Sequence, residues 1–250
     1  MSLEKISKKF PFLVVPLHYI VTLLLYIQCS LIIGIALFPS IYLIYQYWTS
    51  TEGSLTQGWT LLLRLLGFSI FLAAGFFLYA IVLIFVVAAV CFIFQLKIKE
   101  GRHYVYSAEA MKWANYNSLI LIVRYTCINF LRVTPFITLF HRLMGAKIGK
   151  NVQINTAVIG DSCFLEIGDH TVVGGDVTLV AHVAEHDTLV VKKVKIGKKV
   201  TLGIMSIIMP GVEIGDNVMI AANSVLIKDT KVPSNTVWGG IPARQISVKK

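Results

Sequence analysis

Charged residues are scarce in this 250-residue chain, at 14% against about a quarter in soluble proteins. The scarcity lies in the first half, where residues 10–51 and 65–95 contain no Asp, Glu, Lys or Arg. A helix of roughly 20 apolar residues crosses a hydrocarbon core about 30 Å thick. A buried helix of a soluble protein rarely stays uncharged for so long, and a signal peptide has only about 7–15 apolar residues. We therefore expect a transmembrane helical region over 1–100, with two spans within 14–47 and 60–96.

Paired cysteines and metal-ligand spacings are also lacking. The four cysteines, Cys29, Cys91, Cys127 and Cys163, are scattered along the chain. Two of them lie inside the apolar runs. This arrangement predicts free thiols and no metal site.

Acidic residues are outnumbered, and the net charge is +10, but we do not expect nucleic acid as a partner. Basic residues beside a membrane set its topology and attract anionic headgroups. Here they lie before the first predicted span and after the second, which places both outer ends in the cytoplasm. The sequence thus predicts an integral protein of the cytoplasmic membrane whose N-terminus and second half are cytoplasmic. These flanking residues are Lys5, Lys8, Lys9, Lys97, Lys99 and Arg102.

Residues 101–145 mix apolar, aromatic and basic residues. The apolar run 119–123 is too short to cross a bilayer and is flanked by Lys112 and Arg124. Such a mixture favours amphipathic helices that lie in the headgroup region. A third crossing is the alternative.

A six-residue repeat dominates the second half. Small residues commonly follow the repeated aliphatic position. A period of six fits neither a helix nor an alternating strand, but it is typical of a parallel β-helix with three six-residue edges in each coil. The aliphatic residue is then expected to point into the interior of the coil. The clearest run of the repeat is Ile196, Leu202, Ile208, Ile214, Ile220 and Leu226.

The repeat is interrupted twice. Its spacing slips within 159–165, which predicts a bulge or a small insertion. Between Leu179 and Ile196 the pattern fails, which predicts a loop extruded from the coil over 181–194. We expect the β-helix to occupy 146–230 in about four coils, followed by a C-terminal tail over 231–250.

Two blocks, IMPGVEIGDN at 208–217 and GGIPAR at 239–244, resemble the ends of maltose, galactoside and capsular-sugar O-acetyltransferases. These belong to the hexapeptide-repeat acyltransferases, and the resemblance implies that the parallel β-helix is left-handed. The expected fold is α+β: transmembrane and interfacial helices, then this β-helix. The segments at 134–149 and 181–185 are also similar to the membrane-bound C-terminal module of nonribosomal peptide synthetase-like proteins, including polylysine synthetases.

Acyl transfer to a hydroxyl or amine needs a base for the nucleophile's proton, and histidine suits this role near neutral pH. His182 and His186 lie in the predicted extruded loop, where similar enzymes place a catalytic histidine. We favour His182, since it directly follows the last regular repeat. Glu185 or Asp187 is expected to orient the ring, or Glu185 to act as base itself. The alternative is that all of these are solvated loop residues.

The resemblance also implies acetyl-CoA or another acyl-CoA as co-substrate, bound between the subunits of a homotrimer. Matching residue for residue, Gly203, Ala222 and Ser224 would line its neutral arm, and Lys228 and Arg244 would lie near its phosphates. The alternative for the three small residues is that the coil needs them at its corners.

The leading hypothesis is a membrane-anchored acyltransferase that acetylates a hydroxyl or amine at the cytoplasmic face. Its membrane-associated acceptor would be a lipid-linked sugar, a lipid headgroup or a hydrophobic metabolite. Two alternatives stay open. One is a non-catalytic trimeric scaffold, and the other is an aminoacyl or peptidyl transfer module that works with a separate thioester-carrying synthetase.

Overall fold

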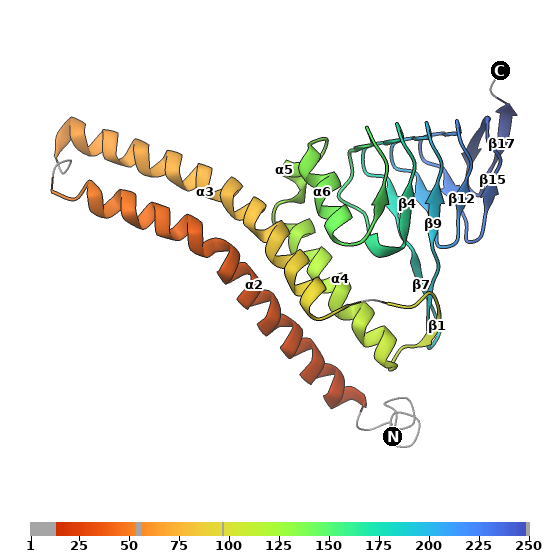
Figure 1. The fold of residues 1–250 in the computed structure, drawn as a ribbon, viewed down its shortest axis with the longest axis horizontal. Helices are drawn as coiled ribbons and strands as arrows, with labels where there is room; N and C mark the ends of the chain where they lie inside the picture. Colours follow the sequence, from red (N-terminus) through yellow and green to blue (C-terminus); the bar gives the residue numbers. More distant parts are fainter. Residues whose placement is uncertain (1–13, 54–56, 97, 249–250) are drawn as a thin grey trace.

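The computed structural model describes residues 14–53, 57–96 and 98–248. Helices α2 (Val14–Ser50) and α3 (Gly58–Ile93) form a long hairpin that projects away from the rest of the chain (Figure 1). Both helices are long and apolar enough to cross a membrane, with mean hydropathy of 2.4 and 3.1 in their most apolar windows. The basic leader at residues 1–9 and the flanking Lys97 lie outside the described residues.

Polar contacts join the two helices of the hairpin. Ser40 Oγ donates to the Gly75 carbonyl at 2.7 Å. Near the turn, Arg64 is buried and its guanidinium donates to the Trp48 carbonyl at 3.0 Å while lying 3.9 Å from the centroid of the Trp48 ring. A cation at the last carbonyls of α2 is favourable because the C-terminal end of a helix carries partial negative charge.

The segment that connects the hairpin to the repeat domain differs in part from the interfacial helices expected over 101–145. Its first residues form strand β1 (Gly101–Tyr104), and three helices follow: α4 (Ala108–Thr126), α5 (Ile128–Leu131) and α6 (Pro135–Leu143). Ser107 caps α4 by accepting from the Ala110 amide. The middle of α4 is buried at Tyr116, whose hydroxyl donates to the Met144 carbonyl at 2.6 Å and accepts from the Cys163 amide at 3.0 Å. Helix α4 is therefore packed against the start of the repeat domain.

The repeat domain is a parallel β-helix made of three sheets. Successive coils pair 18 residues apart, as in Thr201↔Met219 and Ile207↔Val225. The six aliphatic residues of the clearest repeat are buried at 4% exposure or less, which confirms the interior that the six-residue period predicts. The first sheet contains β2 (Lys147–Ile148), β4 (Leu165–Ile167), β9 (Val194–Ile196), β12 (Glu213–Ile214) and β15 (Lys231–Val232).

The other two sheets complete each coil. One contains β6 (Thr178–Leu179), β11 (Ile207–Ile208) and β14 (Val225–Leu226). The third contains β3 (Gln153–Ile154), β5 (Val172–Val173), β10 (Thr201–Leu202), β13 (Met219–Ile220), β16 (Thr236–Gly240) and β17 (Ala243–Val248). Strand β16 pairs in parallel with β13, so the coil continues into the region expected to be a tail, and β17 returns antiparallel to β16.

Charges of alternating sign follow the first sheet from strand to strand. The register places Lys147 beside Glu166, Glu166 beside Lys195, Lys195 beside Glu213, and Glu213 beside Lys231. Lys147 Nζ lies 2.9 Å from Glu166 Oε1, and Lys195 Nζ lies 3.0 Å from Glu213 Oε1. These lysines hold the pKa values of both glutamates below their usual range.

The segment expected as an extruded loop over 181–194 is a β-hairpin. Strands β7 (His182–Glu185) and β8 (Thr188–Val191) pair antiparallel, and β1 adds to β8, so that the strand order is β1-β8-β7. Thr201 pairs with Val172, 29 residues earlier, which is 11 more than in a regular coil. The hairpin occupies this excess and leaves the β-helix beside the start of α4 (Figure 1).

Candidate active site

The candidate site lies where the two interruptions of the repeat meet. The first interruption carries Asp161, whose backbone is left-handed (φ 54°), followed by a 3-10 turn over Ser162–Phe164. The second is the hairpin that begins at His182, at the corresponding corner of the next coil. Asp161 is fully buried. Its Oδ2 lies 2.5 Å from His182 Nδ1 and accepts from the Ala181 amide at 3.1 Å.

This contact defines which nitrogen of His182 is free to act. An ionised carboxylate only accepts hydrogen bonds, so Nδ1 carries the hydrogen that points at Asp161. In the neutral ring Nε2 then has a free lone pair, which is the form a general base needs. A buried carboxylate at this position also stabilises the imidazolium that forms when the base takes up a proton.

Trp113, on α4, contacts both Asp161 and His182. Its Nε1 donates to Asp161 Oδ1 at 2.7 Å, and its ring lies 4.6 Å from the His182 ring, centroid to centroid. The three donors together hold both oxygens of Asp161, which fixes the direction of the carboxylate. Sequence reasoning proposed Glu185 or Asp187 for this orienting role and missed Asp161 and Trp113. The signal for Asp161 was the slip in the repeat at 159–165; no local pattern marks Trp113.

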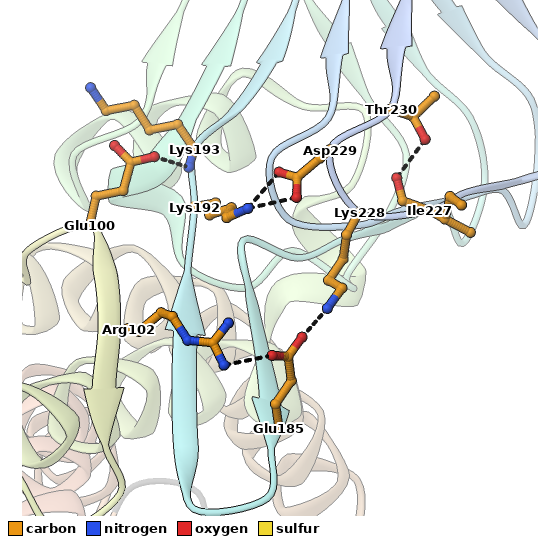
Figure 2. Close-up of polar contacts among 9 residues, drawn as sticks. All are labelled: Glu100, Arg102, Glu185, Lys192, Lys193, Ile227, Lys228, Asp229 and Thr230. Atoms are coloured by element: carbon orange, nitrogen blue, oxygen red, sulfur yellow. Dashed lines mark hydrogen bonds and ion pairs between the residues drawn. The ribbon is translucent and has the colours of Figure 1, made fainter.

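Glu185 is placed away from the His182 ring. Alternate residues of a strand point to opposite faces, and Glu185 Oε2 lies 3.0 Å from Arg102 Nη2 of β1. Its other oxygen contacts Lys228 Nζ, in the turn after β14 (Figure 2). His186 is exposed in the two-residue turn of the hairpin (φ 50°), at the opposite end from Asp161. The structure therefore separates the three residues proposed as catalytic, and pairs only His182 with an orienting group.

Further polar contacts attach the base of the β-hairpin to a later coil and to the residue before β1. Lys192 Nζ bonds both carboxylate oxygens of Asp229, at 2.8 and 2.6 Å, and the Lys193 amide donates to Glu100 Oε1 at 3.0 Å (Figure 2). The β-hairpin is thus held at its base, where β8 ends, as well as at Glu185, where β7 ends. A rigid support of this kind keeps a catalytic side chain in one geometry.

An apolar pocket of about 520 Å³ opens beside His182. Its walls come from the first described turns of α2, the start of α4, the segment between β1 and α4, and the hairpin. It is lined by Val21, Thr22, Leu25, Val105, Tyr106, Ala110, Met111, Trp113, Ala114, His182, Val183, Ala184 and Leu189. His182 is the one histidine in this lining, and it places an imidazole ring at the wall of the pocket.

Most of the residues proposed for the acyl carrier lie at one corner of the stacked coils, where Arg244 pairs with Gly239, beside Ala221 and Ser224, and only Lys228 lies at another. A Cβ on Gly203 would lie 2.4 Å from the Ala222 nitrogen, so Gly203 serves the close stacking of coils. Ser224 is buried, and its Oγ accepts from the Gly240 amide at 3.2 Å. Ala222 and Lys228 are exposed at different corners of the coil, and Arg244 is exposed on β17.

Two groups near Asp161, the buried His141 and the partly buried Cys163, have shifted pKa values. His141, on α6, shares a 2.8 Å hydrogen bond with Ser162 Oγ, and burial lowers its pKa to about 3. Burial likewise raises the pKa of Cys163 to about 12. Both are therefore uncharged at neutral pH. Within the residues that the structure describes, no group of three His, Cys, Asp or Glu is placed to hold a metal ion.

Comparison with known proteins gives three kinds of likeness. Residues 193–228 match the bacterial transferase hexapeptide family (six repeats). YvoF of Bacillus subtilis (strain 168), assigned as an acetyltransferase, is 32% identical over 162 residues, which cover 61% of this chain and 92% of YvoF. Galactoside O-acetyltransferase of Escherichia coli (strain K12) is 36% identical over 107 residues, covering 40% of this chain and 52% of the enzyme.

The delta-poly-L-ornithine synthetase of Acinetobacter baumannii is 28% identical over 116 residues, which cover 46% of this chain but only 9% of the synthetase. Among solved structures, a hexapeptide-repeat acetyltransferase of Vibrio cholerae aligns with a TM-score of 0.46 and 23% identity over 60% of this chain and 96% of its own. A galactoside acetyltransferase in complex with coenzyme A aligns with a TM-score of 0.44 and 23% identity, over 55% and 82%.

Proposed function

Since this chain belongs to the hexapeptide-repeat acyltransferases, we propose that it transfers an acetyl or other short acyl group from acyl-CoA to a hydroxyl or amine at a membrane surface. The observation that carries the proposal is the contact of His182 with the buried Asp161. It gives the chain a positioned base, which a non-catalytic scaffold does not need. The left-handed coil implied by the family resemblance is part of the same proposal.

In the proposed reaction, His182 Nε2 takes the proton of the acceptor hydroxyl or amine as its oxygen or nitrogen attacks the thioester carbonyl. The carbonyl π electrons move to oxygen, and Asp161 stabilises the imidazolium. When the tetrahedral intermediate collapses, the carbonyl re-forms, the carbon–sulfur bond breaks, and the imidazolium returns the proton to the thiolate. The products are the acylated acceptor and free coenzyme A, and the base is regenerated.

We propose that α2 and α3 anchor the enzyme in the cytoplasmic membrane, with the β-helix on the cytoplasmic side. At 1.5 Å per residue, a helix of 37 or 36 residues is roughly 55 Å long, which exceeds the 30 Å hydrocarbon core. The buried part of α3 (Tyr79, Ala80, Leu83, Ile84, Val87) packs with the connecting helices. The part of the α2–α3 helical hairpin near its turn would then cross the bilayer. The active site would lie on the cytoplasmic side of the membrane.

For the donor, we propose that Ala222, Lys228 and Arg244 contact coenzyme A. All three are exposed, and Lys228 lies at a different corner of the coil from Ala222 and Arg244. We propose that a neighbouring copy completes the carrier site. A homotrimer, as the family resemblance implies, provides such grooves between copies.

The test is release of coenzyme A from acetyl-CoA by the purified full-length protein in detergent, with and without a membrane-lipid extract. His182→Ala is expected to lower the rate by about 10²–10⁴-fold, which is the usual contribution of a general base. His170→Asn, an exposed histidine at a left-handed position (φ 57°) on the β-helix, is the matched control. His186→Ala distinguishes the two candidate bases. If His186→Ala loses turnover while His182→Ala keeps it, the general base is His186 and not His182.

A further inference from the structure

The pocket beside His182 points to a class of acceptor. Its lining is apolar apart from Thr22, Tyr106 and His182, and it is closed on one side by helix α2. A free sugar has several hydroxyls that need hydrogen-bond partners, and a site that leaves them unpaired binds sugar poorly. An alkyl chain needs none, and it gains free energy for each methylene it buries.

The position of the pocket matches such a chain. Val21 and Leu25 line it from within the apolar segment Tyr19–Ser50. The neighbouring Leu23 and Leu24 of the same helix are 59% exposed, so the apolar outer surface of α2 extends from the proposed membrane-spanning part to the pocket. The pocket therefore continues the apolar surface of the helical hairpin toward His182. It lies at the N-terminal end of α2, which is the end nearer the β-hairpin in Figure 1.

The donor has a different approach. The exposed residues proposed for coenzyme A, Ala222, Lys228 and Arg244, lie on later coils of the β-helix. The pocket is formed instead by α2, α4 and the β-hairpin of β7 and β8. Lys228 contacts Glu185, at the other end of the strand that begins with His182, so the proposed donor residues adjoin the β-hairpin without lining the pocket.

We infer that the acceptor is a lipid amphiphile: a hydroxyl or amine borne on an apolar chain, with the chain in the α2–α4 pocket and the nucleophile at His182 Nε2. This inference rests on the proposed acyltransferase function. Val21, Leu25 and Ala114 select for the chain, and Trp113 separates the chain from Asp161.

The experiment uses the purified full-length protein in detergent, acetyl-CoA as donor, and straight-chain alcohols of increasing length as acceptors, kept below their aggregation concentrations. Each methylene buried in the pocket is expected to raise kcat/KM by up to about fourfold, the factor that corresponds to about 0.8 kcal/mol. The rise should stop once the pocket is full. Val21→Trp fills the pocket and should end the rise at a shorter chain, whereas Leu24→Trp, on the exposed face of the same helix, should leave the profile unchanged.

Leu25→Ala provides a test of opposite sign that does not depend on tolerance of a large side chain. It enlarges the pocket and should move the plateau to longer alcohols. A second arm keeps a short alcohol as acceptor and lengthens the donor from acetyl-CoA to octanoyl-CoA. If Val21→Trp penalises the long donor and not the long alcohol, the pocket holds the donor's chain and the inference is wrong.

The same data separate this inference from the proposed function. A wild-type enzyme that acylates short and long alcohols equally is an acyltransferase without a chain-selecting pocket, which overturns the inference alone. A wild-type protein that binds no coenzyme A by calorimetry and acylates no alcohol refutes both.

Discussion

Replacing Asp161 with Asn tests the central contact of the site with almost no change of shape. The carboxylate accepts from three donors: His182 Nδ1 at 2.5 Å, Trp113 Nε1 at 2.7 Å and the Ala181 amide at 3.1 Å. An amide keeps one acceptor and replaces the other with a donor. If its nitrogen takes the Oδ2 position, the His182 ring must turn its lone pair to it and carry its proton on Nε2, so that it can no longer act as a base.

If the amide nitrogen takes the Oδ1 position instead, it opposes Trp113 Nε1–H, and the negative charge that stabilises the imidazolium is lost in either case. A catalytic base contributes about 10²–10⁴-fold. At 1.36 kcal/mol per tenfold, the Asp161→Asn variant should lose roughly 3–5 kcal/mol of transition-state stabilisation. The accompanying donor–donor contact should lower the free energy of unfolding by about 1–3 kcal/mol.

The assay is coenzyme A release under kcat/KM conditions, with thermal unfolding and coenzyme A binding measured on the same samples. Glu213→Gln, an exposed carboxylate paired with Lys195, is the control for charge removal. The double variant with His182→Ala should be no slower than His182→Ala alone, because residues that act as one unit are not additive. A folded Asp161→Asn variant that keeps more than about a third of the wild-type rate would refute the role of Asp161.

Three further predictions concern stability and reactivity. His141 stays neutral down to about pH 3 in the folded protein but takes up a proton below about pH 6.5 in the unfolded chain. The free energy of unfolding should therefore decrease as the pH is lowered from 6.5 to 3, by up to about 1.4 kcal/mol per pH unit. Denaturant titrations at several pH values should show this slope reduced in His141→Leu and kept in His170→Asn. Gly203→Ala places its Cβ 2.4 Å from the backbone of the next coil and should lower the free energy of unfolding by about 1–3 kcal/mol. A Cβ at Gly175 has a side-chain carbon at 3.4 Å as its nearest atom, so Gly175→Ala should change stability only slightly. Equilibrium unfolding of the two variants measures the difference. Burial raises the pKa of Cys163 to about 12, so in the native protein iodoacetamide at pH 8 should modify it far more slowly than after denaturation, as read by mass spectrometry of its peptide.

The repeat domain could be predicted because its core is periodic. Each aliphatic residue from Ile196 to Leu226 occupies the same place in its coil, so the six-residue spacing was enough to identify the β-helix and the two interruptions. The continuation of the coil through Trp238 was missed, since Pro233 follows Val232 and Trp238 stands where the repeat has an aliphatic residue. Strand β16 pairs there with β13 at the 18-residue separation of a regular coil.

The site itself could be predicted only in part. His182 was identified by its place at a break in the repeat, and the structure gives it an orienting carboxylate. That carboxylate comes from the preceding coil, and Trp113 comes from a helix some 70 residues earlier. Such pairings arise from the stacking of coils and the docking of α4. Glu185 was proposed for orientation because of its nearness in sequence, but strand alternation turns it toward Arg102 and Lys228.

The alternating charges on the first sheet have a consequence for how the coils find their neighbours. Consecutive coils are close to interchangeable inside, since each offers an aliphatic side chain at the same point, so interior packing alone would allow a folding chain to omit a coil and pair the next one in its place. Omitting the coil of Lys195 would bring Glu213 against Glu166, and omitting that of Glu213 would bring Lys231 against Lys195. Like charges directly opposite are destabilising, by a few tenths of a kcal/mol or about 1 kcal/mol each. The charged residues on the outer face of the sheet thus favour the native order of coils, which interior packing alone does not determine.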